Sequence, residues 1–274
     1  MARGARRGAV ALLVVLVALI GIVLGARALW NKAQSAVASD GCDFGSYHLN
    51  LTRSQNAATI VGVVLKRGLP EHAAVLVLGA ALQESKLDNI PAGQGDRDSV
   101  GVLQQRPSQG WGTEAQLADI RYATGVFLDA MLKVPDWRTA PLSQVIQEVQ
   151  VSADGSAYAR HESQATAMSG VLMGLTPGGV TCDFGKPAKP AATRTVASEL
   201  ASELPVQTPE TSASVVRVSG AGWATTAWLI THAAHYGIDR VSYSGRSWIR
   251  SKGWRNDSLA SSANEVRATL ASLS

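Results

Sequence analysis

Apolar residues recur at helical spacing through most of the stretch between residues 54 and 173. Ser54 is placed to cap the first helix and Gly68 to end it, and Thr113 opens the spacing of a capping box. No part of this stretch alternates over enough residues to predict a long strand. We therefore expect a mainly α domain over residues 42–183. The pattern predicts helices over residues 54–68, 70–86, 113–133, 142–151 and 154–173.

The composition changes after residue 183. Pro, Ala, Thr, Ser and Glu dominate residues 184–213, which is typical of an extended, exposed linker. Regular patterns return in residues 214–274, and they predict a small α+β domain. Its expected elements are strands over 215–218 and 240–243, a helix over 223–236 and a terminal helix from about residue 262.

A strongly apolar segment lies near the N-terminus. Residues 9–26 form an uncharged run of 18 residues preceded by three arginines. As a helix this run reaches ~27 Å, which is long enough to span a bilayer. We expect residues 1–32 to form a basic cytoplasmic tip and one transmembrane helix, with the bulk of the chain outside the cell membrane. A cleavable signal peptide is the alternative, because residues 36–38 read AVA, a small-residue cleavage site.

The two cysteines, Cys42 and Cys182, are each followed by Asp-Phe-Gly. A lone pair of cysteines in an oxidising compartment normally forms a disulfide. This bridge would close a loop of roughly 140 residues and stabilise the fold by ~5 kcal/mol in the loop-entropy model. Two unrelated thiols are the alternative.

The net charge of +4 does not indicate a nucleic-acid partner. Five basic residues lie in residues 1–32, so the remainder of the chain holds 20 basic and 21 acidic residues. Residues 214–274 differ, with seven basic and three acidic residues and four of the seven tryptophans. That composition suits an envelope protein or the anionic cell wall as a partner. Alternatively, these tryptophans form the core of a small domain.

One carboxylate stands out in the second predicted helix. Glu84 shares a stripe with Val77 and Ala81, so its side chain projects from an apolar face near the helix end. Burial raises the pKa of a carboxyl group, and a raised pKa allows it to act as a general acid near neutral pH. The alternative is a solvated residue in the last turn.

Two short motifs around Glu84 resemble those of a known family. Residues 80–85 read AALQES, and residues 99–107 read SVGVLQQRP after a glycine-rich loop. A helix that ends in Glu-Ser, followed by a Gly-x-x-Gln turn, resembles the Slt-type lytic transglycosylases and goose-type lysozymes over residues 55–165. The resemblance implies a lysozyme-like fold and Glu84 as the acid and base. It also implies Gln104 in a glycan-binding groove, with Ser85 and Ser99 supporting the loop.

The chain departs from this family at its third motif. Gln150 lies where the family usually has an Ala-Tyr-Asn-Ala-Gly segment that helps to hold the substrate. Tyr158 lies in the region where the family places a tyrosine near the acid, so it is expected to bond Glu84 or a sugar amide. Alternatively, Tyr158 is simply an aromatic residue on a helix face.

A second carboxylate is not dictated by the sequence. Asp96 and Asp98 lie in the glycine-rich loop, where they could serve as a base or could be solvated or paired with Arg97. Trp111 is placed to stack on a sugar or to close the loop onto the core. The sequence predicts no metal ligands and no cofactor, because His161 is followed by Glu162 without the second histidine of a zinc helix.

Together with the apolar N-terminal segment, the resemblance implies a membrane-anchored enzyme that cleaves peptidoglycan glycan strands after N-acetylmuramic acid. It would be a lytic transglycosylase or a lysozyme-like glycosidase. Two alternatives remain open at this point. One is a non-catalytic cell-wall-binding or assembly protein, and the other is a wall-remodelling subunit of a secretion or conjugation machine.

Overall fold

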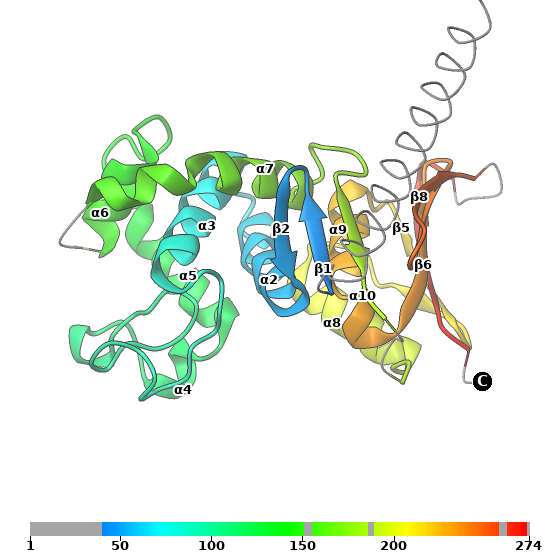
Figure 1. The fold of residues 1–274 in the computed structure, drawn as a ribbon, viewed down its shortest axis with the longest axis horizontal. Helices are drawn as coiled ribbons and strands as arrows, with labels where there is room; N and C mark the ends of the chain where they lie inside the picture. The colour runs from blue at the N-terminus through cyan, green and yellow to red at the C-terminus, as the bar shows by residue number, and fades with distance from the viewer. Residues whose placement is uncertain (1–39, 151–154, 186–188, 258–261, 273–274) are drawn as a thin grey trace, which may run out of the picture. The chain divides into compact units, whose positions relative to one another are not determined.

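The computed structural model describes residues 40–150, 155–185, 189–257 and 262–272 (Figure 1). Contacts group residues Asp40–Ser274 into one compact unit. Within that unit, helices form one end, the small sheet lies near the middle and the larger sheet lies at the other end.

The small sheet has three antiparallel strands in the order β2-β1-β3. These strands are β1 (Gly41–Phe44), β2 (Tyr47–Asn50) and β3 (Val180–Asp183). Cys42 of β1 lies opposite Cys182 of β3 in the register, and the two form a disulfide. The predicted bridge is therefore confirmed, and it joins strands that lie 140 residues apart in the sequence.

The helices between β2 and β3 agree with the periodicity, but their ends differ. Asn50 caps the first helix through the amide of Arg53, while the Ser54 hydroxyl donates to the Asn50 carbonyl. Thr113 forms the predicted capping box with Gln116. The elements are α2 (Leu51–Lys66), α3 (Glu71–Ser85), the 3-10 helix η1 (Pro107–Gln109), α4 (Glu114–Leu117), α5 (Ile120–Met131), α6 (Leu142–Gln150), the 3-10 helix η2 (Gly155–His161) and α7 (Glu162–Leu172).

The larger sheet has six antiparallel strands in the order β4-β5-β9-β6-β7-β8. Two helices, α9 (Trp223–Thr231) and α10 (Ala233–Tyr236), pack against it. The strands are β4 (Glu210–Thr211), β5 (Val215–Ser219), β6 (Ile238–Tyr243), β7 (Arg246–Ile249), β8 (Gly253–Asn256) and β9 (Glu265–Leu270).

The expected mainly α fold with a lysozyme-like helical domain is wrong, because two antiparallel sheets accompany the helices. The terminal helix expected from residue 262 is instead strand β9, whose residues alternate between half-buried and buried. Strands of four residues, such as β1, β2 and β3, are too short to show a convincing alternation.

The expected transmembrane helix falls in residues 1–32, which lie outside the described residues. Over the part of the chain that the structure describes, no helix is sufficiently long and apolar to cross a bilayer.

The segment expected to be an extended linker contains helix α8 (Thr193–Glu203). Its apolar face buries Val196, Ala197 and Leu200 against the rest of the molecule. An apolar stripe at helical spacing outweighs the flanking prolines here, since burial of three side chains stabilises the helix.

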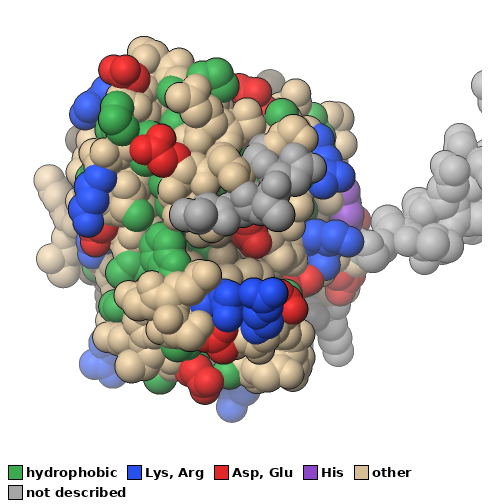
Figure 2. Space-filling view, turned by 90° about the vertical axis from the view of Figure 1, so that its left-hand side faces the viewer, with side chains coloured by type: hydrophobic (Ala, Val, Ile, Leu, Met, Phe, Trp, Pro, Cys, Tyr) green, Lys and Arg blue, Asp and Glu red, His purple; other side chains and the backbone are tan. Residues whose placement is uncertain are grey.

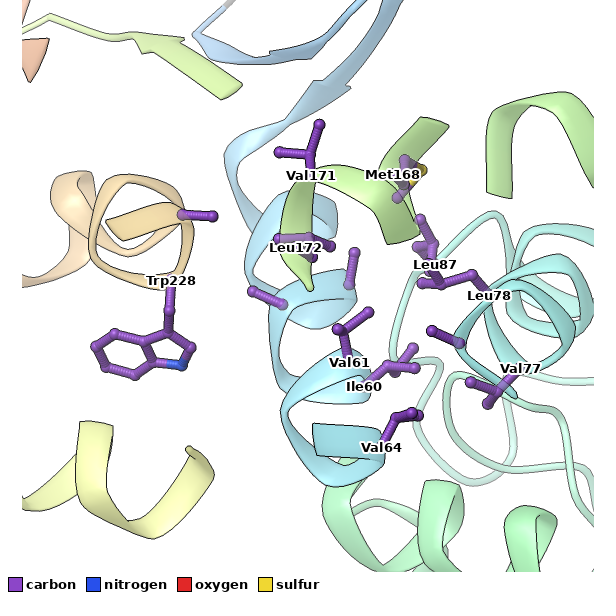
Figure 3. Close-up of a cluster of buried hydrophobic side chains, with 14 of the residues drawn as sticks. Ile60, Val61, Val64, Val77, Leu78, Leu87, Met168, Val171, Leu172 and Trp228 are labelled. Carbon is purple, nitrogen blue, oxygen red and sulfur yellow. The ribbon is translucent and has the colours of Figure 1, made fainter. Parts of the chain in front are cut away.

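One core runs through the whole unit. Helix α2 contacts α3, α5, α7, α8 and α9. Figure 3 shows Trp228 of α9 on one side of α2 and Val77 and Leu78 of α3 on the other, with Val171 and Leu172 of α7 above. The helical part and the larger sheet therefore share α2 as a common support.

Candidate functional site

Glu84 lies in the last turn of α3, and the helix ends immediately after it. Lys86 and Leu87 both adopt a left-handed backbone, with φ of 58° and 69°. The buried Ser85 hydroxyl donates to the carbonyl of Val102 at 2.7 Å. Ser85 therefore fastens the end of α3 to the glycine-rich loop, in agreement with its expected supporting role.

The Glu84 carboxyl is partly buried and has two side-chain partners. The hydroxyl of Tyr158 donates to Oε1 of Glu84 at 2.7 Å, and the amide of Gln150 also bonds the carboxylate. Burial raises the pKa of Glu84 above its ordinary value, while these two hydrogen bonds oppose the rise because they favour the anion. The direction of the pKa shift is that required of a general acid.

Gln150 links Glu84 to the Gly-x-x-Gln turn. Its side-chain amide donates to the carbonyl of Leu103 at 3.1 Å. One side chain therefore contacts both the carboxylate and the turn. Gln150 therefore contributes an amide to the site.

The turn itself is held by short backbone pairs. Val100 pairs with Gln105, and Gly101 pairs with Ile90. Gly101 has φ of 83°, and a side chain there would collide with the carbonyl of Leu117, so the position requires glycine. Gln104, with φ of 46°, bonds the Gly101 carbonyl at 2.9 Å through its own amide.

Ser99 and Trp111 are not joined to Glu84 by a hydrogen bond between described residues. Ser99 is buried, and its amide donates to the carbonyl of Asp96 within the loop. Trp111 is half-buried against the core, and its carbonyl accepts from the hydroxyl of Tyr122. These contacts agree with Ser99 supporting the loop, and with Trp111 closing the loop onto the core.

The two loop aspartates differ in environment. Asp98 accepts hydrogen bonds from Ser108, whose amide lies at 2.8 Å, and from the guanidinium of Arg106 at 2.6 Å. The bonds from the side chain and amide of Ser108, followed by that from Arg106, hold the pKa of Asp98 well below its ordinary value. The side chain of Asp96 is 89% exposed, with Arg97 at 3.8 Å. Asp98 is therefore an ion-paired loop residue whose partner is Arg106 rather than Arg97.

The sequence reasoning missed a second contact between α3 and η2. Oε1 of Gln83 accepts from Arg160 at 3.2 Å and lies 3.0 Å from Nε2 of His161. The sequence held one indication of this contact. Tyr158 and His161 lie three residues apart, so on a 3-10 helix they share the side that faces α3. Within the described ranges, no group of His, Cys, Asp and Glu side chains could hold a metal ion.

The tryptophans of the C-terminal part serve mainly as packing residues. Trp228 and Trp248 are buried, as expected of a domain core. Trp223 and Trp254 pack edge to face, and the guanidinium of Arg246 lies 5.0 Å from the ring of Trp254. Trp254 also donates to the Val180 carbonyl at 2.8 Å, so this cluster joins the larger sheet to β3.

Figure 2 shows the end of the molecule that carries α6 and the glycine-rich loop. Acidic and basic side chains are interspersed over this face with apolar ones, and neither sign forms a continuous patch. Two cavities of about 480 and 370 Å³ lie elsewhere, beside the β6–β7–β9 strands and beside the 204–207 and 220–225 segments. Because neither cavity is lined by Glu84, the candidate site is defined by the hydrogen bonds around Glu84.

No protein-family model matches the chain, and a search of curated proteins also finds no match.

Proposed function

We propose that this protein cleaves the glycan strands of peptidoglycan outside the cytoplasm, with Glu84 as the catalytic acid. The observation that carries the proposal is the partly buried Glu84 carboxyl, whose pKa burial raises and which Tyr158 and Gln150 orient. A protonated carboxyl at a fixed position can protonate the oxygen of a glycosidic bond near neutral pH. The disulfide supports an oxidising compartment.

The proposed reaction uses Glu84 twice. As an acid it protonates the glycosidic oxygen after N-acetylmuramic acid, and the C–O bond breaks through an oxocarbenium-like state. The resulting carboxylate then takes the proton from the 6-hydroxyl of the same muramoyl sugar, and that oxygen closes an anhydro ring. Tyr158 and Gln150 donate hydrogen bonds that stabilise the carboxylate formed between the two steps.

The ion pair of Asp98 favours this intramolecular route over hydrolysis with Asp98 as the base. A carboxylate that activates water must be free to accept a proton. The Asp98 carboxylate instead accepts hydrogen bonds from Arg106 and Ser108. An oriented intramolecular hydroxyl has an effective molarity of ~10⁵ M or more, far above that of water at ~55 M. The products should then be 1,6-anhydro muropeptides, each one water lighter than the hydrolysed form.

The test compares the wild-type protein with Glu84→Gln on purified peptidoglycan, followed by mass analysis of the released fragments. Gln preserves volume and hydrogen bonding but cannot donate the proton, so the rate should fall by ~10²–10⁴-fold. Glu148→Gln is the matched control, since Glu148 is an exposed carboxylate on α6. If Glu84→Gln retains more than about a third of the activity, Glu84 is not the acid.

The fragments also distinguish the two mechanisms. Anhydro ends that persist in Asp96→Asn and Asp98→Asn support the intramolecular route. Reducing muramic acid ends, with activity lost in either variant, would establish a hydrolase with a second carboxylate. Wall binding without any cleavage by the wild type would favour a non-catalytic wall-binding protein.

A further inference from the structure

The cavity of about 370 Å³ lies at the N-terminal end of helix α9. Strand β5 ends at Ser219, and the Gly-Ala-Gly segment of residues 220–222 connects it to the helix. This segment and the first turn of α9 form one side of the cavity, and none of the described residues that line it is charged. The remaining lining residues are Leu65, Leu204, Pro205, Val206 and Gln207.

The first turn of α9 has no side-chain cap. Its N-cap residue is Gly222, which has no side chain to accept from the amides that follow it. The amide of Thr226 donates to the Gly222 carbonyl, which leaves the amides of residues 223–225 without an acceptor inside the helix. A Cβ built on Gly174 would lie 2.6 Å from the nitrogen of Ala224, so that amide is closely covered. The amide of Thr225 therefore remains as a backbone donor beside the cavity.

The hydroxyl of Thr225 also lacks a partner. Thr225 lines the cavity, its side chain is buried with the residue only 3% exposed, and the hydroxyl makes no hydrogen bond to a residue that the structure describes. The other two buried threonines of α9 differ, because Thr226 donates to the Gly222 carbonyl and Thr231 to the Ala227 carbonyl, both at 3.0 Å. Since buried polar groups are normally hydrogen-bonded, the Thr225 hydroxyl indicates a ligand in the cavity.

These donors favour an anion with a single charge. The N-terminus of a helix carries about half a positive charge, which attracts anions. A phosphate group has a charge of about −1.5 to −2 and would need cationic side chains that the described lining does not provide. The exposed Gln207 adds a donor, because its amide nitrogen would lie 3.7 Å from a Cβ built on Gly220. A carboxylate is therefore the better match, and the apolar wall suits a small aliphatic group beside it.

We propose that this cavity binds the free terminal carboxylate of the stem peptides of peptidoglycan, which end in D-alanine. Thr225 would donate to the carboxylate through its amide and its hydroxyl, while Leu204 and Val206 contact the alanine methyl group. The end of a stem peptide that is not cross-linked carries this carboxylate. The choice of occupant rests on the proposed function, because that function brings the protein to the wall. None of the lining residues belongs to the cluster around Glu84, so the cavity is a second site.

The test is a titration of the isotope-labelled full-length protein in detergent micelles, followed by nuclear magnetic resonance. The probes are N-acetyl-D-alanyl-D-alanine, its carboxamide, N-acetyl-L-alanyl-L-alanine and inorganic phosphate. The carboxylate probe with D-alanine should bind at least ~10-fold more tightly than its carboxamide, which lacks the charge. The amide signal of Thr225 should move on binding, which locates the ligand.

The Thr225→Val variant keeps the shape of the side chain and removes the hydroxyl, so it should weaken binding of the carboxylate probe by about tenfold. Thr231→Val is the matched control, because Thr231 is buried at the other end of the same helix and does not line the cavity. The Ala221→Leu variant places a larger side chain in the cavity at a half-buried position and should abolish binding. Circular dichroism establishes that each variant is folded, and the comparison of acid with carboxamide in the wild type needs no variant.

Equal binding of the acid and the carboxamide, or tighter binding of phosphate, would overturn the assignment of a carboxylate site. Tighter binding of the L-alanine probe would assign the cavity to protein C-termini and would overturn the wall peptide as its occupant. Absence of binding in a protein that cleaves peptidoglycan would reject this site and leave the proposed function intact. Binding of the D-alanine probe by a wild type that cleaves no wall would support the site and reject the proposed function.

Discussion

At the scale of single residues, the position of Glu84 opposes the ionisation of its own carboxyl group. Burial favours the neutral acid, while the hydroxyl of Tyr158 and the amide of Gln150 favour the anion. The balance sets the pH at which the acid is half-ionised. Since the protonated form is the reactive one in the first step, these two partners tune the upper pH limit of activity.

Tyr158→Phe should therefore move that limit. The substitution removes a donor that lowers the pKa of Glu84, so the pKa rises further and the carboxyl stays protonated to a higher pH. We expect the descending limb of the pH–rate profile to shift towards higher pH. The maximal rate should also fall, because the carboxylate formed after protonation loses a hydrogen bond.

Tyr122→Phe is the control for this measurement, since the bond that its hydroxyl makes among the described residues is to a backbone carbonyl, that of Trp111. A descending limb that stays in place in Tyr158→Phe, or moves equally in both variants, would show that Tyr158 does not tune Glu84.

The sequence predicted Glu84 and, through the resemblance, Tyr158 as a partner of Glu84 or of a sugar amide, and the structure shows the bond between the two residues, which lie 74 residues apart in the chain. It did not predict that Gln150 also bonds the Glu84 carboxylate. Gln83 gave no such signal, because its contacts with Arg160 and His161 depend on how η2 packs against α3. Local periodicity describes one element at a time, so contacts between elements lie beyond it.

At the scale of elements, length explains most of the outcomes, although helix α8, with 11 residues, was missed. Helices α2 and α3 each complete about four turns, and a helical period is visible over that length. Strands β7 and β8 have four residues each and were not predicted. Strand β9 does alternate, but it contains Ala268 and Leu270, which are good helix formers.

Close approach between elements also depends on single glycines. Gly62 of α2 faces α8, and a Cβ built there would lie 2.8 Å from the backbone carbonyl oxygen of Glu203. Gly125 of α5 faces only the flexible end of Arg67, at 3.1 Å. Both residues are buried inside helices, so they form a matched pair.

Gly62→Ala should destabilise the protein, whereas Gly125→Ala should be neutral or stabilising. Alanine gains up to ~1 kcal/mol of helix propensity over glycine at either site. At Gly62 the collision with backbone costs about 1–3 kcal/mol, which exceeds that gain. Urea unfolding of the two variants tests the expectation, and equal stability of the two would contradict the tight α2–α8 contact.

At the scale of the whole molecule, the separation into a helical domain, a linker and an accessory domain is less complete than the sequence suggests. The residues from Asp40 onward form one compact unit, and α8 packs on α2 within it. Oε2 of Glu203, at the end of α8, accepts hydrogen bonds from Thr59 of α2 at 3.0 Å and from Trp228 of α9 at 2.7 Å. One carboxylate therefore connects three elements that lie far apart in the sequence.

Burial raises the pKa of Glu203 above its ordinary value of 4.5, and its hydrogen bonds and the charge of Arg121 oppose the rise. The neighbouring Glu199 adds to it. Because the folded pKa lies above the unfolded pKa, the stabilisation is complete below the unfolded pKa and is lost as pH rises through the folded pKa. The junction between α2, α8 and α9 should therefore be weaker at pH 8 than at pH 4.

We accordingly expect one cooperative unfolding transition whose midpoint depends on Glu203. An amide oxygen can accept both bonds that reach Oε2, so Glu203→Gln should raise the midpoint relative to the wild type at pH 8 and change it little at pH 4. Glu148→Gln, which changes an exposed carboxylate on α6, controls for net charge. Calorimetry and tryptophan fluorescence should give coincident transitions in every variant, because α2 belongs to the core on both of its sides. Two separate transitions, of which only the one from the later part of the chain depends on Glu203, would instead show that the helical and C-terminal parts unfold as independent domains.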